Sequence, residues 1–63
     1  MTNNVYYEIH ANNNNNDLKR IIKEIKSKYI ATNIVRKLNG SFDNITIKIF
    51  DGEKLLKSTK VKE

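Results

Sequence analysis

The chain is 63 residues long, 38% hydrophobic and formally +5 at neutral pH, with no cysteine and one histidine. This length allows one domain at most, here taken as residues 1–63, and buries only about 60% of the unfolded surface. Disulfides and thiolate metal sites are excluded, and a lone histidine does not assemble a zinc site, so we expect no metal and no cofactor.

The first predicted element is a strand over about residues 4–11. Val5, Tyr7 and Ile9 alternate with more polar positions, and β-branched and aromatic types favour an extended chain. The Asn-rich run at residues 12–16 is typical of a loop, because Asn tolerates left-handed backbone and bonds to its own main chain.

Residues 17–38 are predicted to form a basic amphipathic helix. An apolar stripe starts at Leu18 and recurs with helical spacing at Ile21, Ile22 and Ile25. Lysine and arginine occupy the opposite arc of the same turns. A break near residues 29–32 is an alternative.

The second half of this helix, after Tyr29, admits two interpretations. Its apolar residues recur with helical spacing, but the segment also alternates as a strand that would turn at Asn39-Gly40. We favour a helix to about Leu38, with Gly40 in the left-handed position just beyond it.

Residues 43–61 are predicted to form a hairpin. Ile45, Ile47 and Ile49 alternate with Thr46, Lys48 and Phe50, as in a strand. Asp51-Gly52 is a strong turn signal, and a hairpin that turns there would set Ile47 opposite Leu56. The expected fold class is α+β, one small layer fold of order β-α-β-β, with one helix on an antiparallel or mixed sheet. The order β-α-β-β-β is the alternative.

Catalysis is not expected. His10 stands alone in the sequence, on the polar face of a strand expected at a sheet edge, and no serine has a neighbouring base. We therefore interpret His10 as a solvated surface residue and the protein as a non-enzymatic one.

Basic residues predict a nucleic-acid surface. Lys19, Arg20, Lys23 and Lys26 fall within two turns of the predicted helix, and clustered cations are what phosphate contacts need. The alternative is an ordinary solvated helix face.

A sheet face supplies a second candidate for nucleic-acid binding, because aromatic side chains beside cations can stack bases. The alternative is an edge of the core or a dimer contact. Its residues are Phe42, Phe50, Leu55 and Val61, with Lys48 and Lys57 between them.

A second apolar stripe lies about 150° around the predicted helix from the first. Its residues are Ala31, Ile34, Val35 and Leu38. One small sheet does not cover both stripes of an unbroken helix, so the second stripe predicts a protein partner or a homodimer. A kinked helix that buries both stripes is the alternative.

Two functions follow as hypotheses. The first is a small basic binding protein that contacts nucleic acid or nucleoprotein machinery, mainly electrostatically. The second is a protein-binding inhibitor or accessory factor of the kind that phages and mobile elements encode. No run approaches the roughly 20 apolar residues of a membrane span, so we expect a cytoplasmic protein without a membrane partner.

Overall fold

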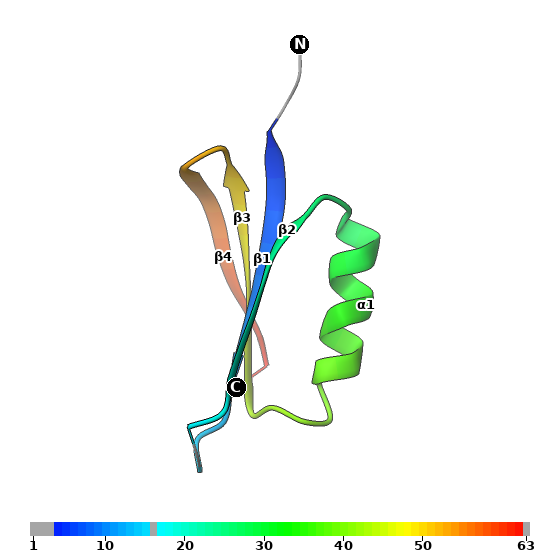
Figure 1. Ribbon diagram of the computed structural model, residues 1–63, viewed down its shortest axis with the longest axis vertical. Helices are drawn as coiled ribbons and strands as arrows, with labels where there is room; N and C mark the ends of the chain where they lie inside the picture. Colours follow the sequence, from blue (N-terminus) through cyan, green and yellow to red (C-terminus); the bar gives the residue numbers. More distant parts are fainter. Residues whose placement is uncertain (1–3, 16, 63) are drawn as a thin grey trace.

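Four strands and one helix make up this computed structural model, which describes residues 4–15 and 17–62. The strands form one antiparallel sheet in the order β2-β1-β3-β4, and the helix lies on one face of it (Figure 1). The elements are β1 (Val5–Asn12), β2 (Lys19–Ile25), α1 (Lys28–Leu38), β3 (Asn44–Asp51) and β4 (Lys54–Lys62). The expected α+β class, one helix on an antiparallel sheet, is thus confirmed, but the element order is β-β-α-β-β.

The core lies between α1 and the central strands. β1 and β3 pair in continuous register, with Ile9 opposite Ile47 and Ala11 opposite Ile45. Partners in such a pair project from the same face, so these residues all point toward the helix. Ile9 and Ile45 are fully buried there, and Ala31 of α1 is 1% exposed because its small side chain lets the helix approach the sheet.

The predicted helix over residues 17–38 is wrong in its first half, which forms the edge strand β2 instead. Ile22 pairs with Ile9 and Ile25 with Tyr7, so three residues of β2 span the length of two on β1. This bulge turns both isoleucines toward the helix, where Ile25 is 6% exposed. A bulged strand therefore explains why Ile22 and Ile25 have helical spacing in the sequence.

The second half of residues 17–38 is helical, as we predicted in preference to a strand. Ser27 caps α1 by accepting a hydrogen bond from the backbone N–H of Ile30 at 3.4 Å, and Asn39 ends it. The prediction of a left-handed backbone at Gly40 is wrong, because Gly52 is the glycine with positive φ in the described chain. Instead, the N–H groups of Ser41 and Phe42 both donate to the carbonyl of Leu38.

The predicted hairpin at residues 43–61 is confirmed, but its register differs. Asp51 pairs with Lys54, so the loop consists of Gly52 and Glu53. Shifts in register near either end of β4 then place Thr59, rather than Leu56, opposite Ile47. The turn is also tied to β1, since the Gly52 N–H donates to the Asn4 carbonyl at 3.0 Å.

The Asn-rich loop is held against the connection between α1 and β3. Asn13 Oδ1 accepts from the Asp43 N–H at 2.8 Å, and the Asn14 N–H donates to Asp43 Oδ2 at 3.0 Å. Asn44 donates to Asn12 and Asn14. These bonds give the Asn run a structural role, although Asn16 lies outside the described residues.

Within the described part of the chain, no helix is long and apolar enough to cross a membrane.

Candidate functional site

The basic residues predicted on a helix lie on the edge strand β2 and the turn after it. Lys19 pairs with Asn12 and Arg20 with Ala11, neighbours on β1 that project to opposite faces of the sheet. Arg20 is therefore on the side of α1, and Lys19 is on the other side, which we call the open face. This corrects the prediction of one basic helix face, because an edge strand presents its cations on both sides.

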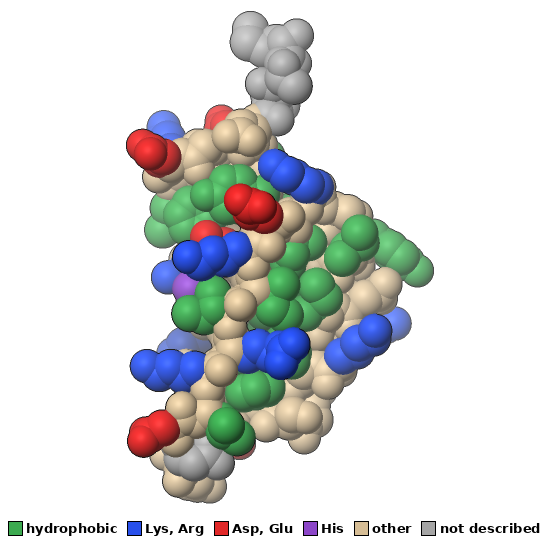
Figure 2. Space-filling model, in the orientation of Figure 1, with side chains coloured by type: hydrophobic (Ala, Val, Ile, Leu, Met, Phe, Trp, Pro, Cys, Tyr) green, Lys and Arg blue, Asp and Glu red, His purple; other side chains and the backbone are tan. Residues whose placement is uncertain are grey.

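Cations of α1 extend this basic surface. Lys28 begins the helix, and Arg36 and Lys37 lie in its last turn, where positive charge complements the helix dipole. All seven cations are exposed, and we call them the basic flank: Lys19, Arg20, Lys23, Lys26, Lys28, Arg36 and Lys37. In Figure 2 the viewer looks onto the β2 edge with α1 beside it, and Lys and Arg side chains surround a band of apolar ones.

An aromatic stack occupies the open face near the end of β2. The rings of Tyr6 and Phe50 are stacked with centroids 5.4 Å apart and planes 11° from parallel. Lys26 Nζ lies 5.7 Å from the centroid of the Tyr6 ring, and it comes from the β2 side while Phe50 comes from the β3 side. Each face of Tyr6 thus already has a neighbour, so a nucleic-acid base would have to displace the exposed Lys26 side chain in order to stack on this ring.

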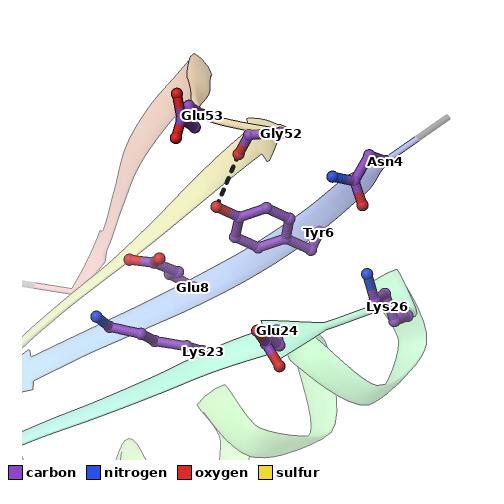
Figure 3. A pocket seen from close by; sticks show the side chains of 8 residues that line it. All are labelled: Asn4, Tyr6, Glu8, Lys23, Glu24, Lys26, Gly52 and Glu53. Carbon is purple, nitrogen blue, oxygen red and sulfur yellow. Dashed lines mark hydrogen bonds between the residues drawn. The ribbon is translucent and has the colours of Figure 1, made fainter.

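A shallow hollow of about 400 Å³ lies beside this stack. Figure 3 shows Tyr6 donating a hydrogen bond to the Gly52 carbonyl at its rim, a bond of 2.9 Å. Lysine and glutamate side chains both line it: Lys23, Lys26, Glu8, Glu24 and Glu53. Because the three carboxylates outnumber the two cations here, the hollow does not suit an isolated phosphate.

The other predicted nucleic-acid residues are not brought to the basic flank. Lys48 is half-buried in the centre of the open face, opposite Glu8. Lys57 pairs with Ile49 on the helix side of β4, at the far edge of the sheet.

The aromatic face that was predicted with these two lysines is also divided. Phe50 and Leu55 are partners on the open face, whereas Phe42 packs against the core. Val61, 44% exposed, lines a groove beside α1. No single platform of the predicted composition results, because a bulge in β4 and the α1–β3 connection send these residues to different sides.

The predicted protein-binding stripe is also corrected. Ala31 is buried, and Ile34, Val35 and Leu38 pack against the core cluster. A helix that begins at Lys28 has one apolar face to cover, and the sheet covers it. The second stripe arose from extending the helix back through residues that form β2.

His10 is likewise in a different setting from the one expected. β1 is a central strand, so His10 is half-buried, and its Nε2 lies 2.9 Å from Glu8 Oε1 on the same face. In the described chain no group of three or more histidine or acidic side chains is placed to hold a metal ion.

The predicted binding residues do not include Lys28, Arg36 and Lys37. Their signal was present in the charge distribution: residues 18–38 hold seven Lys and Arg and one Glu, a formal +6, so the rest of the chain sums to −1. The fold keeps this segment together as β2 and α1. Comparisons with protein-family models, curated proteins and solved structures find no match to the chain.

Proposed function

We propose that this protein is a non-enzymatic nucleic-acid-binding protein that contacts the sugar-phosphate backbone through its basic flank. One observation carries the proposal: seven exposed cations come from the edge strand β2, from α1 and from the turn between them, and the remaining chain has almost no net charge. Each phosphate contact by such a cation releases condensed counterions, which favours binding.

The chemistry of the flank favours weak sequence specificity. Five of its cations are lysines, which act as point charges, and only Arg20 and Arg36 can form planar, two-bond contacts. The Tyr6–Phe50 stack is occupied by its own neighbours. Binding therefore depends on the charge of the backbone rather than on the identity of the bases.

A charge-reversal experiment tests the proposal. We expect Lys19→Glu with Lys23→Glu to weaken binding to a fluorescein-labelled oligonucleotide by at least about tenfold in fluorescence anisotropy. Both side chains are exposed on an edge strand, so circular dichroism should stay unchanged.

The matched control is Lys54→Glu with Lys57→Glu on β4, the opposite edge of the sheet. It changes the net charge by the same amount, and we expect a loss of less than about threefold. Equal losses in both double variants would show that net charge alone, and not the basic flank, determines affinity. No measurable binding by the unmodified protein would refute the function itself.

A further inference from the structure

Most of the β3–β4 half of the helix-bearing face of the sheet has no covering element, although Ile45 at the start of β3 is buried in the core. Strands lie about 4.8 Å apart, whereas a helix with its side chains is about 10 Å wide, so one helix covers about two strands. The contacts of α1 with the sheet are mainly with β1 and β2. On the half formed by β3 and β4, a strip about as wide as one helix therefore remains uncovered.

A groove of about 220 Å³ occupies this strip. Its floor includes Ile47 and Ile49, which are half-buried and point to the helix side because they pair with Ile9 and Tyr7. Val61, 44% exposed, lines the groove from β4, and Ala31 lines it from α1. The lining is thus largely apolar and remains open to solvent.

The charges at this groove have one sign. Lys28 lines it from the start of α1 and Lys57 from β4, and no carboxylate is among its lining residues in the described chain. Apolar side chains between two ammonium groups complement a segment that carries an apolar stripe flanked by Asp or Glu.

We propose that the groove docks an acidic amphipathic helix of another protein, which lies beside α1 and completes the layer of helices on the sheet. Apolar residues of that helix at i, i+3 or i+4, and i+7 would cover Ile47, Ile49 and Val61. Its carboxylates would meet Lys28 and Lys57. The groove shares only Lys28 with the basic flank, and Lys19 and Lys23, which the nucleic-acid test reverses, do not line it, so the two proposals are tested separately.

A second copy of this chain is a poor occupant. The one helix in the described residues of the chain is α1, and residues 28–38 contain no Asp or Glu. A second copy therefore has no acidic helix to offer. An α1 helix from a second copy would bring Lys28, Arg36 and Lys37 toward the lysines of the groove. Like charges in contact disfavour that arrangement.

The test uses a synthetic peptide of about 18 residues, long enough to form a helix, with a leucine stripe flanked by glutamates. A second peptide carries lysine at each glutamate position. Each is titrated into ¹⁵N-labelled protein. We expect saturable amide shifts with the acidic peptide, concentrated at residues 28–32, 47–49 and 57–61, and none with the basic peptide.

Thr59→Glu and Ser58→Glu are the matched variants. Thr59 pairs with Ile47 on the groove side of β4, whereas its neighbour Ser58 pairs with Lys48 on the open face. A carboxylate in the groove repels the glutamates of the acidic peptide, so we expect Thr59→Glu to raise the Kd at least about tenfold and Ser58→Glu to change it less than about twofold. If Thr59→Glu does not fold, Lys57→Glu replaces it, with the same expected loss.

Four results would overturn the proposal. The acidic peptide fails to saturate, or its shifts fall outside the groove, or Ser58→Glu weakens its binding as much as Thr59→Glu does. The fourth is a concentration-dependent dimer in analytical ultracentrifugation that Thr59→Glu abolishes, which would assign the groove to a second copy instead.

Discussion

Gly40 and Gly52 show how one residue type serves two different backbone needs. Gly52 has φ of 64° in the first position of its two-residue hairpin loop, a conformation that L side chains rarely adopt. Gly40 follows the helix with φ outside that region, and a Cβ there would have no neighbour within 4 Å. Glycine is thus needed at Gly52 by its backbone conformation and is replaceable at Gly40.

We predict opposite effects for the two alanine substitutions. Gly52→Ala should lower the free energy of unfolding by about 1 kcal/mol through left-handed strain alone, because its Cβ would meet only Asn4 Nδ2 at an ordinary 3.9 Å. Gly40→Ala should raise it by about 0.5 kcal/mol by restricting the unfolded chain. Urea denaturation measures both; a loss at Gly40 equal to that at Gly52 would contradict the assignment.

At the scale of elements, β2 depends on one unusual residue. Glu24 has φ of 58°, and it lies within the bulge that separates the Ile22 and Ile25 pairings. Left-handed backbone costs about 1–2 kcal/mol in a residue with a side chain. The pairing of β2 with β1 and the burial of Ile25 offset this strain.

Replacing Glu24 by glycine should therefore stabilise the protein. The relief of left-handed strain exceeds the entropic cost of glycine, so we expect Glu24→Gly to raise the free energy of unfolding by up to about 1 kcal/mol. The control is Lys23→Gly, one position earlier with an ordinary φ, which should destabilise by about 0.5–1 kcal/mol. Equal destabilisation by both changes in a urea titration would show that the bulge is not strained.

At the scale of the whole molecule, the fold separates two surfaces of different character. The basic flank follows the β2 edge and α1, whereas the apolar groove lies between α1 and β4, over the opposite half of the sheet; Lys28, at the start of α1, belongs to both. Charge reversal on β2 should therefore leave peptide binding in the groove intact. The two proposals therefore assign partners of different chemistry to different surfaces of a chain of 63 residues.

The salt dependence of nucleic-acid binding should report how many cations of the flank act together. About four phosphate contacts predict a slope of about −3.6 for log K against log salt on duplex DNA, a loss of roughly 100-fold between about 50 and about 200 mM salt. Anisotropy titrations at several salt concentrations measure this slope. Affinity that stays constant over that range would exclude a mainly electrostatic contact.

Local patterns were sufficient for several elements. The alternation in β1 and β3, the turn signal at Gly52 and the helix end near Asn39 were predicted from neighbouring residues, and the structure has them. The first half of the predicted helix failed because Leu18, Ile21, Ile22 and Ile25 fit a helical stripe as well as a bulged strand. The candidate site was also predicted only in part: four of its seven cations were identified, but the three cations of α1 and the distribution of the flank over two faces of the sheet were not.

The sequence by itself determined the small size, the positive charge concentrated in residues 18–38, the absence of thiol chemistry and the types of most elements, because these depend on composition and on neighbouring residues. Only the tertiary structure decided that β2 is a strand, that Ala31 and Leu38 face the core, and that a groove stays open beside α1. Those outcomes depend on pairing with β1 and on the width of one helix relative to four strands, which are contacts between distant residues.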